Sequence, residues 1–217
     1  MTLYASLDGR RVVRVTVSIP YYGAWSADVD TEEDISGTGI LDLVLGDLTL
    51  RGTIVERGSF AGDRRMRMVA GAAGWRTTVQ PRGYSNAAGV PVALVLGDVA
   101  SEVGETLADT PTGTAGPHYA RPRGFASTTL RELGGALWWV RPDGRTTFAA
   151  RDTSPIVSPI TVVSRDPATR RVVIATEHPV DWMPGRSFAT ITIPTLSVHY
   201  TRITSELSGT MRVEVLT

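Results

Sequence analysis

The 217-residue chain contains no cysteine and no lysine. The missing thiols exclude disulfide bridges, thiolate catalysis, and zinc-finger or iron–sulfur sites built on cysteine. All 22 basic side chains are therefore arginine, which we attribute mainly to the codon bias of a GC-rich genome, and 22 acidic side chains balance them. A net charge of zero argues against a dedicated nucleic-acid-binding protein, which would normally carry a basic excess.

Long apolar runs are missing as well. No stretch approaches the roughly 18 consecutive apolar residues of a membrane-spanning helix, so we expect no membrane anchor. The segment from Met1 to Asp8 lacks the charged and then apolar regions of a secretory signal. Hydrophobic residues still make up 42% of the chain and charged residues 20%. This composition provides enough apolar material for a core and excludes global disorder.

Residues 1–80 show the alternating pattern of β-strands. Apolar and polar side chains alternate with a period of two, which is typical of a strand with one buried face. Gly46-Asp47 separates two such segments and has the chemistry of a tight hairpin turn. Because several strands follow one another without a helix signal, we predict a small β-barrel. The predicted strands are Val12–Ile19, Ile40–Leu45, Leu48–Val55, Arg64–Ala70 and one that opens at Trp75.

Residues 81–152 differ in character and predict a small α+β module. Apolar residues of Val90–Val103 recur at helical spacing, and Gly104 suits the position just past the end of a helix. A second short helix is expected over Ser127–Leu137, although Gly134-Gly135 weakens it or ends it early. Trp138–Ala149 then forms a hairpin around a Pro-Asp-Gly turn.

Residues 153–217 return to the β pattern and predict a second small β-barrel. Thr153–Pro159 is interpreted as a linker or an extended edge. The whole chain is therefore expected to be mainly β, with two small β-barrel domains flanking the α+β module. The strands expected in the last block are Ile160–Ser164, Arg171–Thr176, Phe188–Ile193, Leu196–Thr204 and Met211–Leu216.

Candidate metal ligands are few and scattered. His118, His178 and His199 lie in three separate predicted elements or loops, and no pair has the spacing of a metal site. The acidic run 28–34 resembles the start of a calcium loop, but Glu33 occupies the position of the obligatory turn glycine, and Gly39 that of the bidentate glutamate. We interpret the run as a solvated turn between strands, and a weak, exposed divalent-cation site remains an alternative.

Motifs for enzymatic chemistry are missing from the sequence. There is no G-x-S-x-G nucleophile elbow and no Walker sequence. The segment Gly37–Asp42 lacks the third glycine of a dinucleotide fingerprint and leads into a strand. We therefore assign no catalytic, cofactor-binding or metal-binding residue, and we expect neither enzymatic activity nor a cofactor.

Arginine and aromatic residues raise the question of an interaction surface. Arg64, Arg65 and Arg67 share a predicted strand, and Arg121 and Arg123 share a loop. With Trp75 and Tyr119 nearby in sequence, a nucleic-acid patch is conceivable. The zero net charge favours a polar interface or a solvated strand face instead. Trp138 and Trp139 point to opposite faces of a strand, which suggests one core residue and one core residue or subunit contact.

The order of these pieces is more informative than any single motif. A β block is followed by a helix, a Tyr-Ala-Arg-Pro loop, a second helix, a Trp-Trp hairpin and a last β block. The segments that carry this order are Leu43–Thr53, Val69–Trp75, Val92–Gly104, Tyr119–Gly124, Trp138–Gly144 and Met183–Gly185. The succession resembles the baseplate hub proteins of long-tailed bacteriophages and the hub part of related contractile injection systems.

This resemblance implies a structural, non-catalytic subunit of the tail baseplate or tail tip. It implies a homotrimeric ring that adapts a sixfold tail tube to a threefold spike and continues the DNA channel. The expected partners are the tail tube protein and a spike or tail-tip protein, with the tape measure protein as a further candidate, and contact with DNA is only passing. The protein is expected in the virion, in the phage tail baseplate, after assembly in the cytoplasm of the bacterial host.

Two alternatives stay open at this point. One is a β-rich carbohydrate- or cell-wall-binding module at the tail tip, because Tyr21, Tyr22 and Trp25 present rings that would stack on sugars if exposed. The other is a wall-degrading hydrolase that works through two carboxylates. The order of the acidic residues in the sequence does not point to such a pair.

Overall fold

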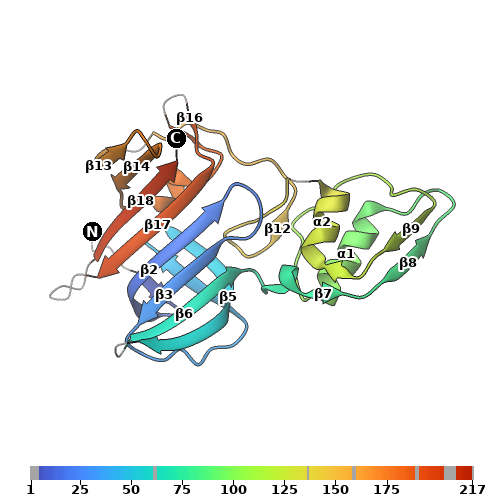
Figure 1. Ribbon diagram of the computed structural model, residues 1–217, viewed down its shortest axis with the longest axis horizontal. Helices are drawn as coiled ribbons and strands as arrows, with labels where there is room; N and C mark the ends of the chain where they lie inside the picture. The colour runs from blue at the N-terminus through green and yellow to red at the C-terminus, as the bar shows by residue number, and fades with distance from the viewer. Residues whose placement is uncertain are drawn as a thin grey trace.

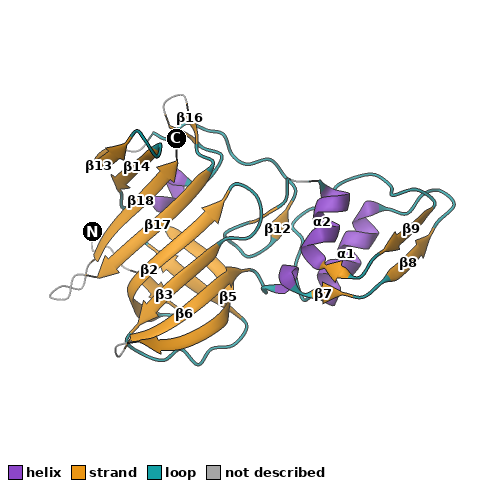
Figure 2. Cartoon of the chain, viewed as in Figure 1, coloured by secondary structure: helices purple, strands orange, loops and turns teal. Residues whose placement is uncertain are grey.

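The computed structural model describes residues 5–60, 63–135, 137–157, 160–188, 191–202 and 209–216. Strands dominate these ranges, and the two α-helices lie together in one small module. The molecule is elongated, with the sheets at one end and the module at the other (Figures 1 and 2). The predicted class, mainly β with a small two-helix α+β part, is confirmed.

The first β block closes into a six-stranded antiparallel barrel. Its strands are neighbours in the order β1, β4, β5, β6, β3 and β2, and closure comes from the additional pairing of β1 with β2. Gly46-Asp47 forms the predicted hairpin turn, with Gly46 at a positive φ of 60°. The bounds are β1 (Ala5–Leu7), β2 (Arg10–Pro20), β3 (Ser26–Thr31), β4 (Ile40–Leu45), β5 (Leu48–Phe60) and β6 (Asp63–Ala70).

The second β block continues the sheet of the first. Strand β17 pairs with β2 from Thr195↔Pro20 to Thr201↔Arg14, and β18, β14 and β13 follow in that order. Strand β1 closes the first barrel by pairing only with Arg10 and Arg11 of β2. The rest of that edge of β2 is therefore available to pair with β17. The sequence predicted a second barrel, whereas these described strands extend the first sheet. Their bounds are β13 (Thr161–Asp166), β14 (Arg171–Ala175), β17 (Thr195–Arg202) and β18 (Gly209–Leu216).

Two predicted strands differ from the structure. Trp75 lies in the short 3-10 helix η1 (Gly74–Arg76), because Ala73 adopts a left-handed conformation (φ 62°) that turns the chain before a strand can begin. The expected strand Phe188–Ile193 is a small hairpin instead, in which β15 (Ser187–Phe188) pairs with β16 (Ile191–Thr192). Part of the expected linker, residues 158–159, lies outside the described residues.

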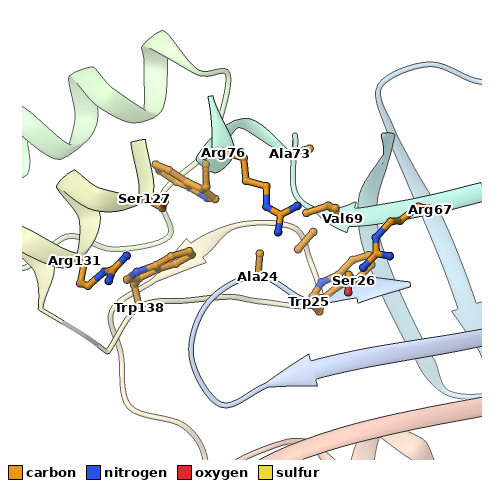
Figure 3. Close-up of a pocket in the computed structure, with 12 residues that line it drawn as sticks. Ala24, Trp25, Ser26, Arg67, Val69, Ala73, Arg76, Ser127, Arg131 and Trp138 are labelled. Atoms are coloured by element: carbon orange, nitrogen blue, oxygen red, sulfur yellow. The ribbon is translucent and has the colours of Figure 1, made fainter. Parts of the chain in front are cut away.

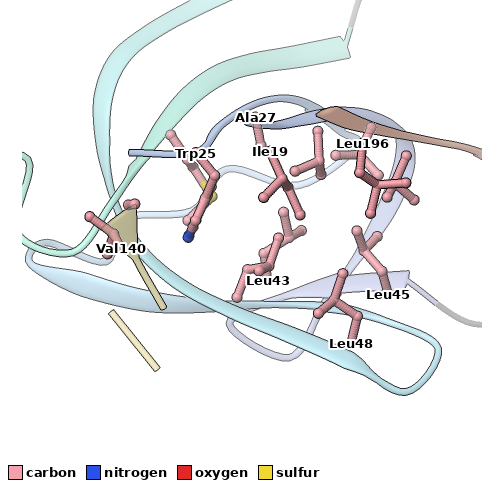
Figure 4. Packing of buried hydrophobic residues seen from close by; sticks show 14 of the residues in the cluster. Ile19, Trp25, Ala27, Leu43, Leu45, Leu48, Val140 and Leu196 are labelled. Atoms are coloured by element: carbon pink, nitrogen blue, oxygen red, sulfur yellow. The ribbon is translucent and has the colours of Figure 1, made fainter. Parts of the chain in front are cut away.

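The core fills the barrel and continues beneath the second block. Alternate residues of β2, Val15, Val17 and Ile19, are 0–1% exposed, as their period of two predicts. Trp25 is 1% exposed and lies against Gly52, where an added Cβ would come within 2.6 Å of the indole. Only glycine therefore fits at position 52 without displacing the ring. Figure 4 shows Trp25 among the core side chains Ile19, Ala27, Leu43, Leu45, Leu48, Val140 and Leu196.

The α+β module contains two packed helices and three two-stranded pairings. Both predicted helices are present, and the second ends at Gly134, followed by Gly135 at φ 78°. Glycine at that position ends the helix before the predicted Leu137. The elements are β7 (Thr78–Val79), β8 (Arg82–Ser85), α1 (Val92–Glu102), β9 (His118–Arg121), β10 (Gly124–Phe125), α2 (Ala126–Gly134), β11 (Trp139–Val140) and β12 (Thr146–Thr147). None of the described helices is long and apolar enough to cross a membrane.

Backbone hydrogen bonds fix the module to the barrel. Gly23 N donates to Trp138 O at 2.8 Å, and Val140 N donates to Gly23 O at 3.0 Å. The guanidinium of Arg151 lies 3.8 Å from the ring centroid of Trp139 and donates to the carbonyl of Tyr21 at 2.9 Å. Burial lowers the pKa of Arg151 to about 10. These contacts place the start of the last β block directly at the end of β2.

Candidate assembly surface

The exposed face of the shared sheet carries unbroken rows of polar residues. One row runs across five strands through direct cross-strand neighbours. Because side chains alternate along each strand, the apolar residues between them point to the core on the other face. The sheet therefore presents one polar surface that spans both β blocks. In order from β6 to β18, the row consists of Arg67, Asp28, Thr16, His199 and Arg212, and the neighbour of Arg212 on β14 is the apolar Ala175.

Asp30 organises the charges on the barrel half of this surface. It is 4% exposed and accepts hydrogen bonds from Arg65 Nε at 2.9 Å and from Arg14 Nη2 at 2.6 Å. These bonds, from Arg65 foremost and then Arg14, hold the pKa of Asp30 below its ordinary value against the opposing effect of burial. Arg67 lies 3.5 Å from Asp28 on the same two strands.

Replacing Asp30 by Asn should make the protein less stable near neutral pH and leave it unchanged in strong acid. A carboxyl whose folded pKa is lowered stabilises the fold above its unfolded pKa, and this contribution disappears as the pH falls through the folded value. We expect a loss of about 2 kcal/mol at pH 7, because both arginines lose a charged partner yet keep access to water. Urea unfolding of the original chain and of the Asp30→Asn variant, from pH 7 to pH 2, measures this loss of unfolding free energy. A difference that does not shrink below pH 4 would contradict this explanation.

The second half of the surface is also neutralised by pairing. Glu214 on β18 accepts from Arg171 of β14, and its Oε2 lies 3.8 Å from His199 Nε2. His199 Nδ1 is 3.3 Å from Thr16 Oγ1, which joins β17 to β2 through side chains as well as backbone. The polar face is thus covered by ion pairs rather than by charge of one sign.

One end of the sheet is the free edge of β13. All six residues of Thr161–Asp166 are exposed, including Val162 (46%) and Val163 (44%). Strand β13 pairs with β14 on one side, and among the described residues no strand pairs with its other side. A bulge between Val162 and Ser164 interrupts the ladder. An apolar edge of this kind is a ready template for a strand of another chain.

Among the described strands, the far half of β5 also lacks a partner strand on one side, although β5 lies within the barrel between β4 and β6. Strand β4 pairs only with Leu48–Thr53, whereas residues 54–60 pair only with β6 in the described part of the chain. Val55 is 45% exposed, and residues 56–59 are exposed too. The neighbouring loop is held by the side chain of Arg57, which donates to Ile35 O and Gly37 O, and not by a backbone ladder. The described strands therefore leave two unpaired edges, one along β13 and one along the far half of β5.

The histidines lie in three different segments of the chain, and each has its own partner. His118 Nδ1 lies 3.0 Å from Ser85 Oγ, and His178 Nδ1 lies 2.9 Å from Asp47 Oδ2. His199 contacts Thr16 on the polar face. Within the described ranges, no group of three metal-ligating side chains comes together.

Arg64, Arg65 and Arg67 lie on β6, a strand as expected, whereas the acidic run and Arg121 are placed differently from expectation. Asp28 and Asp30 lie in β3, not in a solvated turn, which begins only after Thr31. Ala27 and Val29 alternate with polar residues in Ser26–Thr31, and this alternation could have predicted the strand. The acidic residues in it led instead to the expectation of a turn. Arg121 is 2% exposed, and two of its nitrogens donate to the carbonyl of Gln80. A buried guanidinium cannot contact nucleic acid, so that alternative is wrong at this position.

The three rings proposed to stack on sugars, Tyr21, Tyr22 and Trp25, do not share one exposed surface. Trp25 lies in the core and Tyr21 stacks under Arg151, so of the three rings proposed for this role only Tyr22 is exposed, at 45%. Trp138 and Trp139 are both half-buried, the first against Trp75 and the second under Arg151.

Solved structures with the same fold come from phage tails and a secretion system. No known protein family and no curated protein matches the sequence. A tail protein from Neisseria meningitidis MC58 aligns over 100% of this chain and 96% of its own, with a TM-score of 0.63 and 12% identity. The 43 kDa tail protein of prophage MuSo2 from Shewanella oneidensis aligns over 99% and 97%, with a TM-score of 0.67 and 7% identity.

The third structure comes from Escherichia coli. It is a component of the type VI secretion system that is described as similar to the T4 bacteriophage tail proteins gp27 and gp5. It aligns over 98% of this chain and 76% of its own, with a TM-score of 0.56 and 11% identity. The chain thus shares its fold with phage tail and type VI secretion proteins, which confirms the resemblance to baseplate hub proteins drawn from its sequence.

Proposed function

We propose that the chain is a structural hub subunit of a phage tail baseplate or tail tip and that it acts without catalysis. Three copies form a ring that adapts a sixfold tail tube to a threefold spike. The observation that carries the proposal is the shared sheet, which has one polar face and two unpaired strand edges, on β13 and on the far half of β5. The likeness to tail proteins supports the same assignment.

The two open edges favour a ring. Because the edge of β13 and the edge of β5 are different surfaces, joining them between copies gives a head-to-tail interface, which repeats until it closes or runs on as a filament. Each copy contributes two β blocks, so three copies present six blocks to a sixfold tube. We propose that units 1–80 and 153–217 form these two blocks and that 81–152 lies outside the ring wall.

The polar face suits the wall of a DNA channel. A wall of unpaired arginines would hold phosphates through many electrostatic contacts and slow the passage of DNA. Here Arg14 and Arg65 both pair with Asp30, and Arg171 pairs with Glu214. DNA would therefore touch this surface only in passing.

The remaining partners follow from this position. One face of the ring meets the tail tube protein and the other a spike or tail-tip protein, with the tape measure protein as a further candidate in the channel. The protein would be found in the virion, in the tail baseplate, after assembly in the bacterial cytoplasm. No cofactor is part of this role.

Multi-angle light scattering tests the proposal on the full chain, alone and mixed with the tube and spike proteins of the same tail. We expect a particle of three times the 23.3 kDa of one chain, either alone or within the mixture. A mass of one chain under every condition would overturn the proposed ring.

A further inference from the structure

A hollow of about 260 Å³ lies where the barrel meets the α+β module. The end of β6 and the start of β3 contribute its barrel side, and η1, α2 and the residue before β11 contribute its module side. Figure 3 shows the side chains around it. The lining residues are Ala24, Trp25, Ser26, Arg67, Val69, Ala70, Ala73, Trp75, Arg76, Ser127, Arg131 and Trp138.

Two indoles give the hollow a rigid apolar wall. The ring centroids of Trp75 and Trp138 are 6.1 Å apart with an interplanar angle of 53°. Trp75 Nε1 donates to Thr146 Oγ1 at 2.8 Å, which fixes the orientation of that ring. Glu105 accepts from Gly74 N at 2.7 Å and so anchors the turn that carries Trp75. Trp138 remains half-buried, so part of its ring is free to contact a bound group.

Arginines line the hollow without any acid among its lining residues. Arg76 and Arg131 are exposed, and in the described part of the chain no hydrogen-bond or ion-pair partner is found for either. Arg67 lies 3.5 Å from Asp28, with both side chains about half exposed. On the sheet face, by contrast, Arg14, Arg65 and Arg171 are paired with carboxylates.

We propose that the hollow is a docking site for an acidic peptide segment of a partner protein. An apolar side chain of that segment would insert against Trp75 and Trp138, and flanking carboxylates would pair with Arg76 and Arg131. Arginine suits this role because its planar guanidinium binds a carboxylate through two parallel hydrogen bonds. A buried anchor surrounded by charged contacts is the usual arrangement of an interaction hot spot.

The size and charge of the hollow favour a peptide over nucleic acid. Binding of a single-stranded nucleic acid requires a basic groove that follows several phosphates. Here the cationic groups surround one small hollow. Asp28 lies 3.5 Å from Arg67 in the fold, and Glu132 directly follows Arg131 in the sequence. The proposal concerns a surface outside the sheet edges and holds whether or not the chain forms a ring.

Selection from a random dodecapeptide library on the full-length protein tests the proposal. We expect enriched peptides in which two or more carboxylates flank an apolar residue. Binding of a selected peptide should fall about tenfold for Arg76→Gln and for Arg131→Gln, because each removes one charge-assisted pair. Arg123→Gln removes an exposed arginine outside the hollow and should leave the affinity unchanged.

Two further measurements make the outcome decisive. Trp138→Ala should also weaken binding, and circular dichroism melts of every variant show whether the fold persists. The proposal is overturned if no peptide is enriched, if the enriched peptides lack acidic residues, or if folded Arg76→Gln and Arg131→Gln proteins bind as tightly as the original chain. Tight binding of an oligo(dT) strand that competes with the peptide would overturn it in favour of nucleic acid.

Discussion

Lysine at both Val162 and Val163 should convert the proposed three-chain ring into single chains. These two valines are 46% and 44% exposed on the free edge of β13. Lysine on an edge strand blocks pairing with another strand, because its charge would have to be buried in the new interface. The fold of the single chain should persist, since exposed substitutions change stability by about 0.5 kcal/mol or less. Light scattering then measures the mass at matched concentrations.

Leu94→Lys provides the matched control for this experiment. Leu94 is 51% exposed on α1, at the opposite end of the molecule from β13 (Figure 1). It introduces one lysine, where the edge variant introduces two, in place of an exposed apolar side chain and should leave the three-chain mass intact. If the double lysine variant remains fully assembled, β13 is not part of the interface.

Arg121→Ala is expected to cost about 3–5 kcal/mol of unfolding free energy, the largest effect of any single substitution proposed for this chain. The Arg121 side chain is 1% exposed and lies 2.5 Å from Glu102 Oε2. It also donates through Nε and Nη2 to Gln80 O at 3.1 and 2.7 Å. Removing it leaves a cavity, an unsatisfied carbonyl and a carboxylate that has lost its buried partner. Chemical denaturation of the variant measures the loss.

Two comparisons separate charge from volume at this position. Arg121→Met keeps much of the side-chain volume and should be less damaging than Arg121→Ala. Arg123→Ala removes an exposed arginine two residues away and should change stability by about 0.5 kcal/mol or less. Equal stability of Arg121→Ala and Arg123→Ala would show that the buried contacts contribute nothing.

Local patterns predicted the local elements well. The strand Ile40–Leu45 and its hairpin partner follow from alternation and from the Gly46-Asp47 turn, and both are determined by neighbouring residues. The helix Val92–Glu102 follows from its apolar spacing. Its predicted ends differ by one or two residues because caps are weak signals.

The connection between the two β blocks could not be predicted in this way. Thr16 and His199 are neighbours across β2 and β17 although 183 positions separate them in sequence. Alternation shows that each segment is a strand with one buried face, but it contains no information about which edges pair. The candidate surface therefore emerged only when the order of strands was known. The ion pairs of Asp28 and Asp30 could not be predicted for the same reason. Their arginine partners lie on β2, which precedes β3 in the chain, and on β6, which follows it after β4 and β5.

Thiol cross-linking of the two sheet edges tests the proposed ring most directly, and the absence of native cysteine leaves no background reaction. Ser59→Cys on β5 and Ser164→Cys on β13 would be combined in one chain, which places one thiol on each unpaired edge. Treatment with a short bismaleimide should give a denaturing-gel ladder of one, two and three chains that stops at three. Each single-cysteine variant should give no trimer. Bands that continue beyond three chains, or a double variant that stays monomeric, would contradict a closed ring joined through these edges.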